Sequence, residues 1–167
     1  MTAPFTFNTV GSIVFGTGEA ARIGTLAAGR GWRRVLLVTD PGLLATGLVD
    51  PAVASLKEAG IEVAIFSDVA ADPPEPVVQA CTEAARAHGA DAVVGFGGGS
   101  SLDTAKLAAL LARSGEPLAD AYGIGNARGP RLPLMLVPTT AGTGSEVTPI
   151  SIVTTVTRNS PVSGSCS

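Results

Sequence analysis

The chain has 167 residues, of which 46% are hydrophobic and only 15% are charged, and its formal net charge is −3. A chain of this length can form one domain with a sizeable core, and its hydrophobic content excludes global disorder. The small negative charge without a basic run argues against a nucleic-acid partner or an anionic membrane surface. Since few charges coat the surface, assembly into a homo-oligomer is an expectation left open.

The cysteines and the N-terminus indicate a cellular location. Cys81 and Cys166 lie far apart and form no C-x-x-C pattern, which is typical of a reducing compartment. The N-terminus has neither a basic n-region nor an apolar h-region, and no apolar run approaches the roughly 18 residues of a spanning helix. We therefore expect a soluble cytoplasmic protein. His88 is the only histidine, so this chain alone cannot build a multi-histidine metal site.

Short apolar runs alternate with helical stretches along the chain. A weak strand is expected at 13–15 and a strand start at 147–156, and the main strands are predicted at 33–39, 61–66, 91–96 and 132–137. The helices are predicted at 19–29, 51–59, 75–88 and 101–113. This alternation is typical of βαβ units and predicts an α/β fold, with a parallel sheet flanked by helices. The loops that follow the strands then meet at one edge, where such proteins bind ligands.

The first candidate loop is the segment Gly-Thr-Gly-Glu-Ala-Ala at 16–21. It satisfies a short dinucleotide-binding pattern, with Asp40 about 20 residues further on as the acidic member. Two interpretations stay open at this point: a dinucleotide fingerprint, or a plain glycine-rich turn into the first helix.

The second candidate loop, Gly97-Gly98-Gly99-Ser100, directly follows an apolar strand. Without Cβ atoms the backbone can turn tightly and approach a phosphate, and Ser100 or Ser101 can cap the following helix. The free N–H groups and the positive end of the helix dipole would then face an anion such as a diphosphate. The alternative is a plain capped helix after a tight turn. Asp103 and Lys106 share one face of this helix, and we expect them to pair.

The third candidate loop, 138–149, follows the fourth predicted strand at the same sheet edge. It is rich in hydroxyls and glycine, which can donate to phosphate or ribose oxygens. A polar surface loop is the alternative interpretation.

The segments GGGSSLDTAK (97–106) and PTTAGTGSEVTP (138–149) resemble the two hallmark segments of the iron-containing, or group III, alcohol dehydrogenases. FGTG (15–18) and VLLVTDPGL (35–43) resemble earlier segments of that family, and the similarity extends from about Phe5 to Val153. The resemblance implies a Rossmann-like, dehydroquinate synthase-like domain that binds NAD. In the family an all-helical domain with the catalytic metal follows it.

The resemblance also implies roles for individual residues. The diphosphate would rest on the loop of Gly97, Gly98, Gly99 and Ser100, so the loop 16–21 is interpreted as a look-alike. The other cofactor-binding residues would be Asp40, Asp72, Asp103, Thr139, Thr140 and Thr143.

Asp40 would accept hydrogen bonds from the adenosine ribose and repel a 2′-phosphate, favouring NAD over NADP, unless it only caps the turn at 41–42. Asp103 would lie near the nicotinamide, and the three threonines would line the cleft. Asp72 stands where the family often has asparagine, at the adenine-side contact. Two residues have no expected role in binding: His88 is placed exposed near a helix end, and Cys81 in the core.

In the resembled family one aspartate and three histidines of the helical domain hold Fe²⁺ or Zn²⁺, which acts as a Lewis acid during hydride transfer between a primary alcohol or aldehyde and NAD. None of these ligands maps onto this sequence, and from about Thr155 the resemblance is expected to end. We therefore expect a truncated form: a dinucleotide-binding domain at 1–153 and a polar, disordered tail at 154–167, with no catalytic or metal-binding residue of its own. Such a chain would be inactive without its metal-binding domain. Two alternatives stay open, namely a non-catalytic nucleotide-binding module that acts with another chain, and an inert, misfolding-prone fragment.

Overall fold

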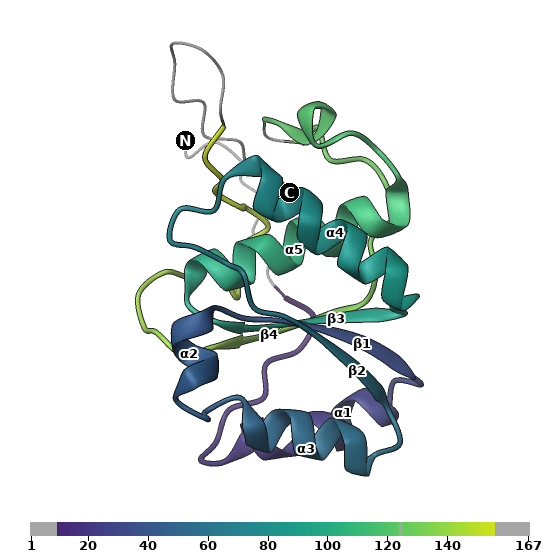
Figure 1. Ribbon diagram of the computed structural model, residues 1–167, viewed down its shortest axis with the longest axis vertical. Coiled ribbons are helices and arrows are strands. Elements are labelled where there is room, and N and C mark those ends of the chain that lie inside the picture. Colours follow the sequence, from purple (N-terminus) through teal and green to yellow (C-terminus); the bar gives the residue numbers. More distant parts are fainter. Residues whose placement is uncertain (1–9, 124, 156–167) are drawn as a thin grey trace, which may run out of the picture.

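The computed structural model describes residues 10–123 and 125–155, which form a sheet between two layers of helices (Figure 1). The strands are β1 (Arg34–Val38), β2 (Glu62–Phe66), β3 (Ala92–Gly97) and β4 (Leu134–Pro138). The helices are η1 (Glu19–Arg22), α1 (Ile23–Ala28), α2 (Pro41–Ala45), α3 (Asp50–Glu58), α4 (Glu75–His88), α5 (Gly99–Ser114) and η2 (Leu118–Ala121), where η marks a 3₁₀-helix. The strands pair in parallel in the order β2-β1-β3-β4, so the predicted α/β fold is confirmed.

The core lies on both faces of the sheet. Val35 and Leu37 of β1 pack with α1 and α3 on one face, whereas Leu36 and Val38 pack with α4 and α5 on the other. All four side chains are almost completely buried, and burying each one stabilises the fold by about 1.5–3 kcal/mol. A strand covered on both faces has a continuous apolar run in its sequence, which is why this strand was predictable.

Most predicted elements are present, with small shifts at their ends. The helix predicted at 75–88 has these bounds in α4. The helix predicted at 19–29 is split into η1 and α1, and the helix predicted at 101–113 begins two residues earlier, at Gly99. The short helices α2 and η2 were not predicted.

The two weaker strand predictions are wrong for the residues that the structure describes. Residues 13–15 pair with no strand, and their side chains are exposed, Phe15 to 98%. Residues 147–155 form one isolated bridge, between Pro74 and Thr154, in place of a strand. Residues 150–155 still alternate between exposed and buried, as in a strand, but a strand also needs a neighbour along its length.

The expected boundary between domain and tail falls where Thr154 contacts the loop before α4. Its N–H donates to the Pro73 carbonyl at 3.0 Å, and its carbonyl accepts from the Glu75 N–H at 3.2 Å. The rest of the expected tail, 156–167, and the first nine residues lie outside the described residues. Within residues 10–123 and 125–155, no helix is long and apolar enough to cross a bilayer.

Candidate functional site

A glycine turn joins β3 to α5 at the carboxyl edge of the sheet. Gly97 ends β3 with φ +151°, Gly98 is the N-cap residue in an extended conformation, and α5 begins at Gly99. Since the first N–H groups of a helix have no intrahelical acceptor, a side chain commonly caps them, yet none caps α5. The prediction that Ser100 or Ser101 is the cap is therefore wrong, because both residues lie inside the first helical turn. The uncapped amides and the positive end of a 16-residue helix suit an anion.

An added Cβ would be crowded at two of the glycines and would make only ordinary contacts at the third. A Cβ on Gly97 would lie 2.8 Å from Ser101 Oγ, and a Cβ on Gly99 would lie 3.2 Å from Thr143 Cγ2. A Cβ on Gly98 would meet nothing closer than Thr140 Oγ1, at 3.6 Å. Of the three glycines, Gly98 is therefore the one whose Cβ position the surrounding residues crowd least.

The loop after β4 lies against this turn, as the sequence predicted. The Thr139 N–H donates to the Gly97 carbonyl at 2.9 Å and extends the β3–β4 pairing by one hydrogen bond. Thr140 then contacts the Cβ position of Gly98, and Thr143 that of Gly99. Figure 1 shows this loop at the left edge, beside the start of α5 and α2. Hydroxyls of the third candidate loop therefore border the second.

Asp40 lies on the other side of the turn. Its Oδ1 accepts from the Leu43 N–H at 2.8 Å and caps α2. The alternative prediction, that Asp40 caps the residues that follow it, is therefore correct for this oxygen. Its Oδ2 lies 3.4 Å from the position that a Cβ on Gly97 would take. One oxygen therefore supports the helix while the other faces the glycine turn, where a ribose contact stays a prediction.

Asp103 and Lys106 form a buried ion pair on α5, which confirms their predicted pairing. Lys106 Nζ lies 2.9 Å from Asp103 Oδ1, and the two side chains are only 10% and 8% exposed. Asp103 Oδ2 also accepts the Ile152 N–H at 3.0 Å. Lys106 Nζ donates to the carbonyls of Ser145, at 2.9 Å, Thr148, at 3.3 Å, and Ile150. Both side chains are thus engaged by the segment that follows β4.

Two predicted positions lie away from these contacts. Asp72, in the loop after β2, is exposed with φ +48°, and its carbonyl accepts from Thr154 Oγ1 at 3.2 Å. Among the described residues no hydrogen bond joins it to the glycine turn, so its adenine contact stays a prediction. The loop 16–21 leads into η1 but follows an exposed, unpaired segment, which is not the strand that a dinucleotide fingerprint requires.

Ser145 is a site residue that sequence reasoning did not select. Its Oγ lies 3.3 Å from the Cβ position of Gly99, closer than any atom of Thr140 lies to that of Gly98. The signal was available, because Ser145 belongs to the same hydroxyl-rich loop as Thr139, Thr140 and Thr143.

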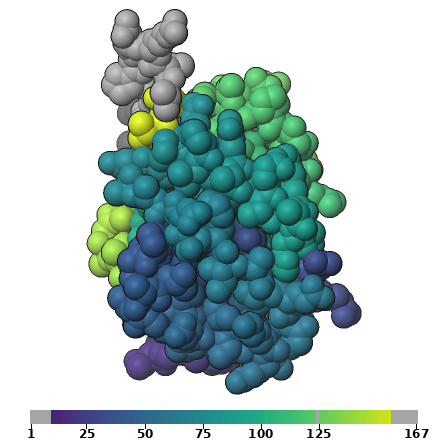
Figure 2. Space-filling model, viewed as in Figure 1, coloured from purple at the N-terminus to yellow at the C-terminus, as the bar shows by residue number. Residues whose placement is uncertain are grey.

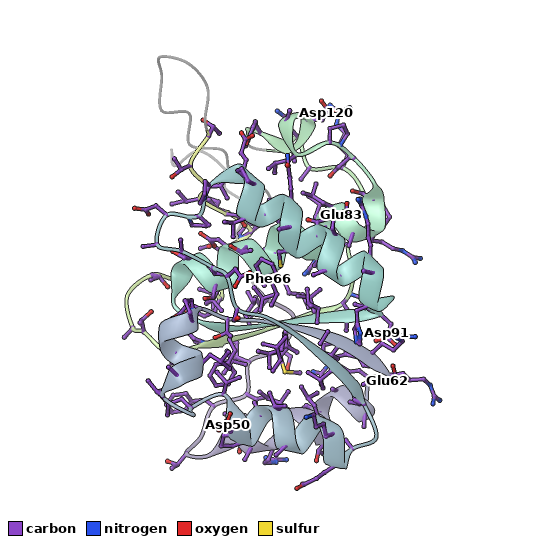
Figure 3. All side chains as sticks on the ribbon, in the orientation of Figure 1. Asp50, Glu62, Phe66, Glu83, Asp91 and Asp120 are labelled. Atoms are coloured by element: carbon purple, nitrogen blue, oxygen red, sulfur yellow. The ribbon has the colours of Figure 1, made fainter. Side chains whose placement is uncertain are left out.

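The described residues contain no group of three or more His, Cys, Asp or Glu that could hold a metal ion. His88, at the end of α4, is half-buried, not exposed as expected, and its Nε2 lies 3.3 Å from the Glu62 carbonyl. Figure 3 shows Glu62 near Asp91 at the edge of the sheet away from α2. Cys81 is fully buried, as predicted, and burial raises the pKa of its thiol to about 12. Neither residue belongs to the site around the glycine turn.

Comparison with known proteins gives a consistent result. The family model of the iron-containing alcohol dehydrogenases matches residues 11–165, beyond Thr155, where the similarity was expected to end. The sulfoacetaldehyde reductase of Bilophila wadsworthia is 39% identical over 149 residues, which cover 89% of this chain and 38% of that protein. The NAD-dependent methanol dehydrogenase of Bacillus methanolicus is 37% identical over 145 residues, 87% of this chain and 38% of that protein.

Solved structures are similar over nearly the whole chain. A 1,3-propanediol oxidoreductase superposes with a TM-score of 0.90 at 34% identity, covering 98% of this chain and 42% of that one. The sulfoacetaldehyde reductase of Bifidobacterium kashiwanohense, solved with NAD⁺, gives a TM-score of 0.85 at 31% identity, covering 99% of this chain and 43% of that one. This chain thus spans less than half the length of these proteins. The matched residues, the sheet topology and the two loops at its carboxyl edge together show that the chain belongs to the iron-containing alcohol dehydrogenase family.

Proposed function

We propose that this chain binds NAD, with the diphosphate on the backbone amides at the start of α5. The observation that carries the proposal is the uncapped helix N-terminus behind Gly97–Gly98–Gly99, where the nearest contact to the Cβ position of Gly98 is Thr140 Oγ1 at 3.6 Å. Backbone amides and a helix dipole suit a doubly charged diphosphate without a basic side chain. A plain capped helix would have a side-chain acceptor at this position.

The surrounding residues would contact the rest of the cofactor. Oδ2 of Asp40 would accept from the adenosine ribose hydroxyls, and its charge would disfavour the 2′-phosphate of NADP. Thr139, Thr140 and Thr143 would line the cleft above the turn, and Asp103 would lie towards the nicotinamide. Asp72 would lie on the adenine side, as the resemblance to the family implies.

We further propose that the chain is the cofactor-binding part of a metal-dependent alcohol dehydrogenase. When bound, NAD would accept or donate the hydride exchanged with a primary alcohol or aldehyde. This chain's own residues would bind the cofactor and orient its nicotinamide. Related proteins are named for methanol, 1,3-propanediol and sulfoacetaldehyde, so the proposed substrate class is a small alcohol or aldehyde. A cytoplasmic location and self-association belong to the same proposal.

We also propose that the 167-residue chain alone turns over no alcohol. The resemblance assigns the family's metal to one aspartate and three histidines, whereas this chain contains a single histidine. Its described carboxylates and thiol form no group that could hold the ion instead. Metal-dependent NADH formation by the purified chain would overturn this part of the proposal.

Calorimetric titration tests the binding proposal. NAD and ADP-ribose, which share the diphosphate and the adenosine, should each bind the wild-type chain at one site. Nicotinamide mononucleotide, which lacks the diphosphate bridge, should bind much more weakly. Gly98→Val should lose NAD binding, because its side chain would fill the space over the turn. Equal NAD affinity of the wild type and Gly98→Val would show that the diphosphate lies elsewhere.

A further inference from the structure

We propose that Lys106 is a positioning residue of the cofactor site, which holds the loop after β4 over the glycine turn. The inference rests on the proposed NAD binding and assigns Lys106 no contact with the cofactor. Its role would be to keep the hydroxyl side chains of residues 139–145 at the distances from Gly98 and Gly99 that the structure shows.

The ammonium of Lys106 is surrounded by protein acceptors. Asp103 Oδ1 and the Ser145 carbonyl each lie 2.9 Å from Nζ, and the carbonyls of Thr148 and Ile150 also accept from it. An ammonium has three protons, so these four acceptors use its full donor capacity. A lysine in this state has no free donor for a substrate and no lone pair for a proton, which excludes the role of a catalytic base in this conformation.

The carbonyls that converge on Lys106 belong to a segment with little internal structure. Residues 139–152 contain no helix or strand. Their internal backbone hydrogen bonds lie in one turn, where the Val147 and Thr148 N–H groups donate to the Gly144 carbonyl at 3.1 Å. The position of the segment relative to α5 therefore depends on tertiary contacts. Lys106, together with the bond from the Ile152 N–H to Asp103, supplies these contacts along its second half.

The first half of the same segment borders the proposed diphosphate position. Thr140 Oγ1 lies 3.6 Å from the Cβ position of Gly98, and Ser145 Oγ lies 3.3 Å from that of Gly99. Ser145 belongs to both groups of contacts, since its carbonyl binds Lys106 while its hydroxyl faces the turn. A shift at Lys106 would thus move a hydroxyl at the site directly.

A buried ion pair alone would be weak evidence for a stabilising role, because the desolvation of two charges offsets their attraction. One partner would suffice for charge compensation, and Asp103 provides it. The three additional carbonyls, 39 to 44 residues further along the chain, indicate that the lysine orders a distant segment.

The test compares Lys106→Met with Lys106→Arg and with Lys57→Met, which removes an exposed lysine on α3 as a matched control. Since Lys106→Met leaves the Asp103 charge buried without its ionic partner, the double variant Asp103→Asn/Lys106→Met removes both charges and keeps an acceptor for the Ile152 N–H. Each variant is titrated with NAD well below its unfolding temperature. Hydrogen exchange is measured over residues 143–152.

We expect Lys106→Met and the double variant to weaken NAD binding by about tenfold or more, because a loop that Lys106 no longer holds must be ordered on binding. Since Asp103 is itself a proposed cofactor contact, the support for positioning comes from the loss in Lys106→Met and from the loop exchange in both variants. Their loop amides should exchange faster, while the exchange of β1 and β3 stays unchanged. Lys106→Arg should restore most of the affinity, and Lys57→Met should bind as the wild type does. Wild-type affinity in both Lys106→Met and the double variant would overturn the positioning role, as would unchanged exchange of the loop.

The same experiment separates this inference from the proposed function. If the wild-type chain binds no NAD, the proposed function fails and the cofactor role of Lys106 fails with it, whatever the exchange data show. If the wild type binds NAD and the Lys106 variants bind equally well, only the positioning role is overturned.

Discussion

The substitution Gly98→Ala should separate cofactor binding from folding. Gly98 has φ −78° and ψ −178°, a conformation that alanine adopts without strain. The new methyl group would lie 3.6 Å from Thr140 Oγ1 and 3.8 Å from its Cγ2, which are ordinary contacts. Alanine is a poorer N-cap than glycine by about 0.5–1 kcal/mol, but it lowers the entropy of the unfolded chain by a similar amount. The unfolding free energy should therefore change by less than about 1 kcal/mol, or about 4 °C in Tm.

The effect on binding should be much larger. The methyl group would occupy the space above the turn and keep a diphosphate away from the amides at the start of α5. Losing one hydrogen bond to a charged group costs about 1.5–3 kcal/mol, so the Kd for NAD should rise roughly 10- to 100-fold. The assay pairs calorimetric titration with thermal unfolding of the same samples. Gly11→Ala is the control, because a Cβ there meets nothing within 4 Å. An unchanged Kd in Gly98→Ala would refute the reasoning, since the methyl group cannot leave a bound diphosphate untouched.

Three further predictions concern packing, cofactor choice and thiol reactivity. Gly24→Ala should lower stability by about 3 kcal/mol or more, seen as a drop in Tm on the order of 10 °C, because its Cβ would lie 1.9 Å from the Ser55 carbonyl oxygen where α1 meets α3. A drop in Tm of less than about 4 °C, the effect of about 1 kcal/mol, would contradict this contact. Asp40→Ser keeps an N-cap acceptor for α2 but removes the charge. It should therefore reduce the preference for NAD over NADP in competitive titration. An unchanged ratio of the two affinities would show that Asp40 does not face the ribose. Burial raises the thiol pKa of Cys81 to about 12, so Cys81 should resist alkylation at pH 8 in a Cys166→Ser background. Denaturant should unfold the chain, return the pKa towards 9.0 and allow labelling. Fast labelling of the folded chain would refute the burial of Cys81.

Local sequence patterns predicted the central elements well, because burial on two faces imposes a continuous apolar run. β1 and β3 are the clearest cases, and each is flanked by the helices that the sequence indicates. The helix α2 was missed because Asp40-Pro41-Gly42 has the composition of a turn, although an aspartate N-cap followed by proline also starts a helix. The strand expected at 147–156 shows the opposite error, since its periodicity is real but its pairing partner cannot be read from local sequence.

The candidate site divides in the same way. The glycine turn and the neighbouring threonine loop were predictable, because both directly follow strands of one parallel sheet and must share an edge. The sequence-based choice of Ser100 or Ser101 as a helix cap was wrong, since composition does not reveal which glycine ends the strand. The contacts of Lys106 with backbone carbonyls could not be predicted from the sequence, because these carbonyls lie about 40 residues away in a segment without a local pattern.

The helices on one side of the molecule pack together without a gap. Figure 2 shows the segments of α2, α3 and α4 joined in one continuous surface, with the loop near residue 140 at the left margin. The loop near residue 140 borders the glycine turn, so the candidate site lies at the carboxyl edge of the sheet.

The account depends on one assignment, namely a diphosphate on the uncapped amides between β3 and α5. A crystal structure of the chain soaked with NAD tests it most directly. The account predicts phosphate oxygens within hydrogen-bonding distance of those amides, with Thr140 beside them and the adenosine ribose near Asp40. Density for the cofactor at any other place on the molecule would contradict it.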